Sequence, residues 1–370
     1  MGVGRRSRAA TSNDVRIGFI GVGGRGTVLL RQASRIDGCR IAAVCDLLTD
    51  RVDRARQEAA KQGHKPQGYA DFREMIEKEK LDGVIVATEP GNHARVIVPV
   101  LEAGVHCFAE KPMDTTVEKV NAIVQAARKA KCIYQIGFQR RYNEDFQKAM
   151  GRIHAGDLGK VFFLQGHWHW SVPCGYRADK HYMDADLSGG RLVEQCCHHM
   201  DVMSWVMKNQ HPIECVGMAA IVGPYKKPLE QVPEDQLAVA FRFPGDVVLS
   251  YTLATFCTKT WLGGGENHEQ LWVYGHQWGM DLMQGEVYFG DGKPERVAEA
   301  TTDFYVKGTT EQLEAFCENI RKGGADRPAS NIETGRIATL MAIMGRHAFR
   351  NEQNKRFECR VVKWEEVDAA

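Results

Sequence analysis

Short apolar runs alternate with amphipathic segments through the first third of the chain. Residues 15–20 form an apolar run of strand length, and residues 27–36 follow with helical spacing. The same alternation predicts further strands at 40–45, 81–87, 105–109 and 132–136, and helices at 49–62, 92–103 and 115–130. Strands that alternate with helices are typical of a parallel sheet covered by helices. We therefore predict an α/β domain over residues 15–140, preceded by a polar disordered lead over 1–14.

The hydrophobic pattern changes beyond residue 140. Predicted strands, divided by turn signals, cover 160–170, 237–243, 247–255, 270–274 and 285–289. Predicted helices cover 192–207, 310–322 and a last long segment that ends at Phe349. A second, mostly antiparallel sheet is the economical interpretation. We predict an α+β domain over residues 141–370.

Composition excludes several classes of partner. The chain has 370 residues, which exceeds one ordinary hydrophobic core and favours two domains. Its 48 Lys and Arg residues balance 47 Asp and Glu residues, so no global field would attract nucleic acid or an anionic membrane surface. The longest apolar run, near residues 83–88, has the length of a strand. We predict neither a nucleic-acid partner nor a membrane span.

Cysteine content bears on the compartment. Eleven cysteines form an odd set without the spacing of a disulfide framework, which favours a reducing environment and the cytoplasm. The alternative is the periplasm, because Arg5-Arg6-Ser7-Arg8 is compatible with the remainder of a trimmed twin-arginine leader.

A glycine-rich loop, Gly21-Val22-Gly23-Gly24-Arg25-Gly26, joins the first strand to the first helix. Gly21 permits a tight turn, Gly23 lets backbone N–H groups approach a pyrophosphate, and Gly26 allows close helix–strand packing. A bare structural turn is the alternative, but Asp46 ends the second strand twenty residues after Gly26, as a Rossmann dinucleotide site requires. Since a carboxylate there accepts ribose hydroxyls and repels a 2′-phosphate, the predicted cofactor is NAD. Arg51 offers an alternative phosphate partner, although its place on a charged helix favours a solvated side chain.

The segment Glu110-Lys111-Pro112 follows the strand at 105–109. It therefore lies at the carboxyl end of the predicted sheet, where such folds bind ligands. Proline biases Lys111 towards extended geometry and allows a cis bond, which would hold the ammonium towards a cleft. A surface lysine in a turn is the alternative.

With these residues in view, the chain resembles the Gfo/Idh/MocA family of oxidoreductases. The matching segments are Gly21–Gly26, Ala87-Thr88 with Asn92-His93, Ala103–His106, Glu110-Lys111-Pro112, Gly137-Phe138-Gln139-Arg140-Arg141 and Gly189–Asp201. The resemblance implies a nicotinamide-binding first domain and a second domain whose large open sheet holds substrate and joins subunits into dimers or tetramers. It also implies cofactor contacts at Gly21, Gly23, Gly24, Arg25, Gly26, Asp46, Thr88, Asn92, His93, Glu110, Lys111 and Gln139.

A stripe of acidic and basic side chains marks the predicted helix at 192–207. Glu194, His198 and Asp201 share one face of a continuous helix. A salt-bridged helix surface would produce the same stripe. Relatives in the resembling family carry Asp-x-x-x-His facing the nicotinamide, and Glu194 with His198 corresponds to that pair. The longer Glu194 arm either relays protons from His198 or contacts a substrate hydroxyl.

The predicted chemistry is oxidation of a secondary alcohol. His198 removes the hydroxyl proton while the carbon-bound hydride passes to NAD. Lys111 donates a hydrogen bond to the same oxygen and stabilises the developing negative charge. Lys111, His198 and Glu194 are thus the predicted catalytic residues and are also predicted to bind substrate.

Aromatic and polar residues crowd two segments ahead of His198. They are His167-Trp168-His169-Trp170 and the run from Tyr176 to Tyr182. Such surfaces suit sugars, and Arg177, Asp179 and His181 are the predicted further substrate contacts. Trp168 and Trp170 are equally compatible with a sheet core. No metal is predicted, because neither His167 with His169 nor the run Cys196–His199 has the spacing of a metal site.

Three function classes remain after these arguments. The first is a dehydrogenase of sugars, glycosides or cyclitols, acting at a ring carbon such as C3. The second is a glycoside hydrolase that uses NAD transiently, with Tyr176, His181 or Tyr182 as its second base. The third is a silent NAD-binding sensor, which would need neither Lys111 nor His198.

Overall fold

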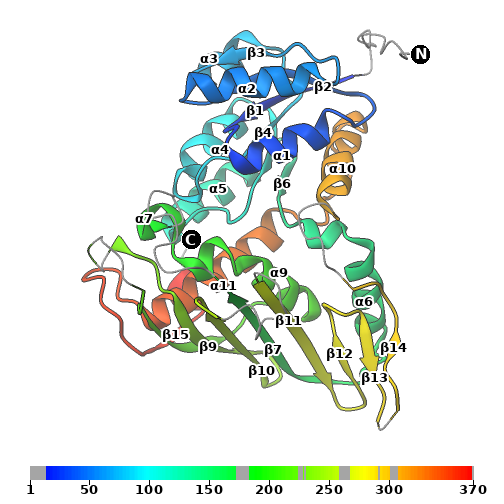
Figure 1. The fold of residues 1–370 in the computed structure, drawn as a ribbon, viewed down its shortest axis with the longest axis vertical. Coiled ribbons are helices and arrows are strands. Elements are labelled where there is room, and N and C mark those ends of the chain that lie inside the picture. The colour runs from blue at the N-terminus through cyan, green and yellow to red at the C-terminus, as the bar shows by residue number, and fades with distance from the viewer. Residues whose placement is uncertain are drawn as a thin grey trace. The chain divides into compact units, whose positions relative to one another are not determined.

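The computed structural model describes residues 14–171, 183–223, 228, 231–257, 267–290, 292–300 and 307–368. The lead at 1–13 and the predicted substrate residues Arg177, Asp179 and His181 lie outside this part of the chain. The molecule divides into two compact units (Figure 1). The first comprises residues 1–113, 121–142 and 305–332, and the second comprises 114–120, 143–304 and 333–370.

The first unit contains a six-stranded parallel sheet in the order β3-β2-β1-β4-β5-β6. Its strands are β1 (Val15–Ile20), β2 (Cys39–Cys45), β3 (Gln67–Tyr69), β4 (Gly83–Val86), β5 (His106–Ala109) and β6 (Tyr134–Ile136). Its helices are α1 (Gly24–Ala33), α2 (Thr49–Ala60), α3 (Phe72–Lys78), η1 (Pro90–Asn92), α4 (His93–Glu102), η2 (Gln139–Tyr142) and α10 (Thr309–Arg321). This strand order is the doubly wound order of a Rossmann fold, which confirms the predicted fold class.

The second unit contains a nine-stranded sheet in the order β14-β13-β12-β11-β7-β10-β9-β8-β15. Its strands are β7 (Val161–Trp170), β8 (Glu214–Ala220), β9 (Gln236–Phe243), β10 (Val247–Ala254), β11 (Asn267–Gly275), β12 (Gly279–Asp281), β13 (Glu286–Tyr288), β14 (Glu295–Arg296) and β15 (Val361–Lys363). Its helices are α6 (Glu144–Ala155), α7 (Ala185–Ser188), α8 (Arg191–Glu194), α9 (Cys197–Val206), α11 (Ile332–Phe349) and α12 (Glu365–Asp368). Among the described residues, the strand pairs of this sheet are all antiparallel except β7 with β10, as predicted for a mostly antiparallel sheet.

Helix α5 (Val117–Lys129) is divided between the two units after Val120. The hydroxyl of Thr116 accepts a hydrogen bond from the N–H of Lys119 at 3.4 Å. Thr116 therefore caps the helix, which begins two residues later than the predicted range 115–130.

One face of the second sheet is buried and the other is open. Burial alternates strictly along β10, as expected when one face packs against a core. Helices α9 and α11 lie on the buried face (Figure 1), where Gly345 of α11 is small enough to pack against the ring of Phe241. The other face leaves Met218 on β8 and Val361 on β15 exposed, at 63% and 54%.

The predicted second domain over 141–370 differs from this division, because helix α10 packs in the first unit. Its side chains Leu313 and Phe316 belong to the core formed by β1, β2 and α1. The ring of Phe316 meets Phe108 of β5 edge-on, with 6.0 Å between centroids. Proximity in sequence to the second sheet is therefore a poor guide to where this helix lies.

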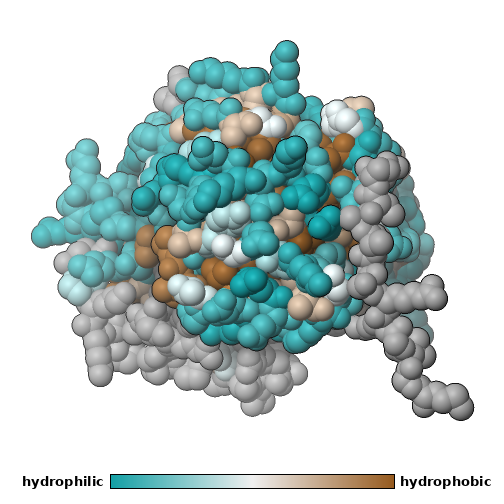
Figure 2. Space-filling model, turned by 90° about the horizontal axis from the view of Figure 1, so that it is seen from above, coloured by the Kyte–Doolittle hydropathy of each residue, from teal (hydrophilic) through white to brown (hydrophobic). Residues whose placement is uncertain are grey.

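Figure 2 shows a mostly hydrophilic face with small apolar areas between the polar side chains. In the described part of the chain, no helix is long and apolar enough to cross a membrane.

Truncating Phe316 tests the place of α10. Because the side chain is fully buried, Phe316→Ala should lower the free energy of unfolding of the first unit by about 3–5 kcal/mol, measured by urea unfolding. Leu47→Ala, at a position 88% exposed in the same unit, is the matched control and should change it by less than about 1 kcal/mol. Equal stability of the two variants would contradict the packing of α10 in this core.

Candidate functional site

The glycines of the loop between β1 and α1 fall into two groups, according to whether a Cβ atom would collide with the backbone. Gly21 has φ +84°, and a Cβ there would lie 2.7 Å from the carbonyl oxygen of Ala87. A Cβ at Gly26 would overlap the carbonyl oxygen of Gly21. These two glycines are therefore demanded by the backbone itself.

The other two glycines leave space. A Cβ at Gly24 would meet nothing within 4 Å, and one at Gly23 would meet the guanidinium of Arg51, 3.5 Å away. Gly23 is the N-cap of α1 and offers no side-chain cap to the first turn of that helix. Open space in front of uncapped N–H groups at a helix N-terminus fits a pyrophosphate.

Asp46 ties this loop to the end of β2. Its buried carboxylate accepts hydrogen bonds from the N–H of Val22 at 3.0 Å and from the N–H of Leu48 at 3.1 Å. The carboxylate thus fixes the loop on one side and the start of α2 on the other. A buried acidic group at this position fits an adenosine ribose, the contact predicted from sequence.

Arg51 differs from the solvated side chain favoured by the sequence. Its Nη1 atom lies 3.7 Å from Oδ2 of Asp46, and its side chain is 36% exposed. The guanidinium also lies beside Gly23. One turn of α2 after Leu48 is enough to bring it back over the loop, so Arg51 belongs to the surroundings of the cofactor site.

Glu110 forms a buried junction after β5. Its Oε1 atom accepts a hydrogen bond from Nε of Arg25 at 2.7 Å, and its Oε2 atom accepts one from the N–H of Lys111 at 3.2 Å. A Cβ at Gly137 would lie 3.0 Å from the same carboxylate. Glu110 therefore joins the first turn of α1, the loop of Lys111 and the loop after β6, where a glycine is needed.

His93 holds the loop that carries Lys111. Its Nδ1 atom lies 2.7 Å from the carbonyl oxygen of Pro112, and its Nε2 atom lies 3.2 Å from the carbonyl oxygen of Thr88. Through these two contacts the fully buried side chain links the loops after β4 and β5. Its predicted contact with the cofactor stays a prediction.

The remaining first-unit residues lie around the same edge of the sheet. The Lys111–Pro112 peptide bond is cis. Thr88 and Lys111 follow β4 and β5 and are partly buried, Asn92 ends η1, and Gln139 begins η2 after β6. The structure thus brings the predicted cofactor residues of this unit to the carboxyl ends of its strands, where doubly wound folds bind ligands.

The predicted helix over 192–207 is wrong in one respect, because it is broken. Helix α8 ends at Glu194 and α9 begins at Cys197. At the break, the N–H groups of Gln195 and Cys196 both donate to the carbonyl of Arg191, at 3.0 and 3.1 Å. His198 and Asp201 share a face of α9 and are buried, but Glu194 precedes the break. The spacing of a continuous helix therefore does not place Glu194 beside His198.

The aromatic segment of β7 has two faces. Trp168 is buried on the covered face of the sheet, and the guanidinium carbon of Arg191 lies 5.4 Å from the ring centre of Trp170. His167 and His169 lie on the open face, where Nε2 of His167 is 2.7 Å from Nδ1 of His268. Burial, together with the neighbouring histidines, lowers the pKa of His167 to about 3. Over the described residues, no group of three or more His, Cys, Asp or Glu side chains could hold a metal ion.

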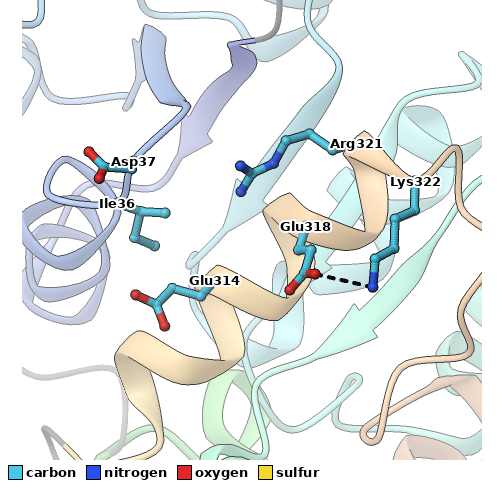
Figure 3. Close-up of a pocket in the computed structure, with 6 residues that line it drawn as sticks. All are labelled: Ile36, Asp37, Glu314, Glu318, Arg321 and Lys322. Carbon is cyan, nitrogen blue, oxygen red and sulfur yellow. Dashed lines mark ion pairs between the residues drawn. The ribbon is translucent and has the colours of Figure 1, made fainter.

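A hollow elsewhere on the first unit is not a candidate for this site. Its volume is about 520 Å³, and it is lined by Ile36, Asp37, Glu314, Glu318, Arg321 and Lys322 (Figure 3). Lys322 and Glu318 already pair with each other at 3.1 Å. Ile36 and Asp37 precede β2, so the hollow lies at the amino end of that strand, away from the ligand edge of the sheet.

Comparison with known proteins assigns both parts of the chain. Residues 15–138 match the oxidoreductase family with an NAD-binding Rossmann fold, and residues 146–279 match the GFO/IDH/MocA C-terminal domain. The chain belongs to the GFO/IDH/MocA oxidoreductase family. NAD is accordingly the cofactor, as predicted, and the loop at Gly23 and Gly24 with Asp46 fits it.

Relatives of known name are distant, and the length of chain that they match varies. A myo-inositol 2-dehydrogenase from Thermotoga maritima is 24% identical over 362 residues, covering 93% of this chain and 99% of the relative. An inositol 2-dehydrogenase from Salmonella typhimurium is 27% identical over 200 residues, covering 53% of this chain and 56% of the relative. The crystal structure of scyllo-inositol dehydrogenase from Lactobacillus casei with NAD(H) and scyllo-inositol superposes with a TM-score of 0.75 at 19% identity, covering 95% of this chain and 99% of that one.

Replacing the two classes of loop glycine should have different effects on stability. Gly26→Ala places a methyl group against backbone and should lower the free energy of unfolding by about 3 kcal/mol. Gly24→Ala, whose methyl group meets nothing, should leave it unchanged or raise it. Thermal unfolding of both variants without cofactor measures this. A Gly26→Ala protein as stable as Gly24→Ala would refute the close approach.

Proposed function

We propose that the protein is an NAD-dependent dehydrogenase that oxidises a secondary hydroxyl of a sugar, glycoside or cyclitol, at a ring carbon such as C3. The observation that carries the proposal is the NAD cradle of Gly23, Gly24 and Asp46 in a chain of this family, with Lys111 at the same edge of the sheet. The named relatives, which are inositol dehydrogenases, favour cyclitols and sugars over other alcohols.

The proposed roles follow from the chemistry of each side chain. When bound, NAD supplies the acceptor for the hydride. His198 takes the hydroxyl proton as general base, and Glu194 orients His198 or contacts a substrate hydroxyl. Lys111 donates a hydrogen bond to the oxygen as negative charge develops. His93 and Glu110 fix the backbone on either side of Lys111.

The decisive experiment follows two products at once. The purified protein is incubated with NAD and a panel of inositols, sugars and aryl glycosides, while NADH absorbance and aglycone release are recorded. The proposal expects NADH to form in proportion to substrate consumed. Aglycone release without net NADH would overturn it in favour of a hydrolase, whose predicted second bases all lie outside the described residues. NAD binding without turnover of any substrate would favour a sensor.

Removing the ammonium of Lys111 tests its electrostatic role. Lys111→Ala should lower kcat by roughly 10² to 10⁴ while leaving the Kd for NAD largely unchanged. The matched control is Lys61→Ala, which removes an ammonium 64% exposed at the end of α2 and should keep full turnover. Turnover that survives in Lys111→Ala would remove this residue from the mechanism.

We further propose a homodimer or homotetramer formed through the open face of the nine-stranded sheet. Val361 of β15 pairs with Val216 of β8 in register, and Met218 lies two residues further along β8, so apolar side chains gather at that edge. Met218→Lys should weaken the assembly, which size-exclusion chromatography with light scattering would show as a smaller mass. A monomeric wild-type protein would contradict the proposal.

The proposed compartment is the cytoplasm. The cysteines in the described part of the chain are all free, which suits a reducing environment. Export with a twin-arginine leader is the alternative, and fractionation of cells that express the natural gene distinguishes the two.

A further inference from the structure

A chain of buried polar side chains crosses the covered face of the second sheet. His199 of α9 hydrogen-bonds through Nδ1 to the hydroxyl of Tyr251 on β10 and through Nε2 to Oε2 of Glu269 on β11, each at 2.8 Å. Tyr251 and His199 are fully buried, and the Glu269 side chain is 3% exposed. The buried thiol of Cys196 lies beside the same Tyr251. We call Cys196, Tyr251, His199 and Glu269 the buried relay.

The sheet is shaped to receive this relay. Strand β7 lies between β10 and β11, and its Trp168 stacks on the ring of His199 with centroids 4.8 Å apart and planes 24° apart. One row along β7, Gly166 pairs with Tyr251, and a Cβ at Gly166 would lie 2.9 Å from the tyrosine ring. The histidine is therefore held by side chains from three adjacent strands, and a glycine makes room for one of them.

The hydrogens of the relay can satisfy both ring nitrogens of His199. Burial raises the pKa of the Cys196 thiol well above its ordinary value, so the thiol keeps its proton. With the ring proton of a neutral His199 on Nε2, the Tyr251 O–H donates to Nδ1 and the Nε2–H donates to the Glu269 carboxylate. Buried polar networks whose members are all satisfied fix one arrangement of the elements that carry them.

Members of the buried relay lie on both sides of His198 in the sequence. Helix α8 ends at Glu194, so backbone hydrogen bonds of a continuous helix do not set the direction of α9. Cys196 lies in the break before His198, and His199 directly follows it. Both side chains reach the same tyrosine on the sheet. The first turn of α9 is thus fastened to the sheet on each side of His198.

We infer that Tyr251, His199 and Glu269 are positioning residues that hold the first turn of α9, and with it His198, in its working orientation. This inference rests on the proposed function for the role of His198. The fastening itself is independent of substrate and can be measured without turnover.

The test compares Tyr251→Phe with Tyr274→Phe by hydrogen–deuterium exchange and by steady-state kinetics. Both variants lose one hydroxyl from the same sheet, but Tyr274 contacts Gln165 on the opposite face. Tyr251→Phe should speed amide exchange in residues 196–206 by roughly 2- to 10-fold, since one net hydrogen bond is lost, while α11 stays protected. It should lower kcat at least as much while leaving KM for NAD and for substrate within twofold. Tyr274→Phe should change none of these.

A second pair of variants guards against a simple packing effect. Glu269→Gln keeps an oxygen that can accept the Nε2–H bond, whereas Glu269→Leu keeps the approximate volume without an acceptor. Protection of α9 and kcat should follow the order wild type, Glu269→Gln, Glu269→Leu. Unchanged exchange and unchanged kcat in Tyr251→Phe would overturn the inference. Altered exchange in a protein whose wild type oxidises no alcohol would instead refute the proposed function and leave the fastening in place.

Discussion

The close approach of α1 to β1 is the constraint on which the cofactor site depends. A side chain at Gly26 would overlap the carbonyl of Gly21, and a side chain at Gly21 would collide with the backbone after β4. The helix can therefore begin directly above the strand ends, with its N-terminus directed at the ligand edge of the sheet. Asp46 then fastens the same loop to β2 through the N–H of Val22.

Buried polar side chains extend this constraint to the neighbouring loops. Glu110 connects Arg25 of α1 with the backbone of Lys111, and His93 connects the loops after β4 and β5. Loops at the carboxyl ends of parallel strands lack the backbone hydrogen bonds that join strands in a sheet. Buried polar side chains hold these loops in place instead. In the second unit the buried relay does the same for α9, where a broken helix leaves the backbone without continuous support.

The sequence predicted the features that depend on local pattern. The apolar runs gave the main strands, and the glycine loop with Asp46 gave the cofactor. Strand β3 was missed because Gln67–Tyr69 is short and exposed and carries no apolar run. Helix α3, which follows it, was missed as well. Helix α6 was missed although its signals are present, with Asn143 capping its start at 2.8 Å and Gly156 ending it at φ +93°. Tyr251 and Glu269 could not be found, because strand register alone brings them to His199.

Helix α10 makes the first unit discontinuous in sequence. The chain leaves this unit at residue 142 and returns to it at residue 305, so Leu313 and Phe316 reach the core last. During synthesis the apolar side of α1 must stay uncovered while residues 143–304 of the second unit emerge from the ribosome. A ribosome-bound chain that ends before α10 should therefore expose apolar surface of an incomplete nucleotide-binding unit. We expect chaperones to bind this surface until α10 has been synthesised.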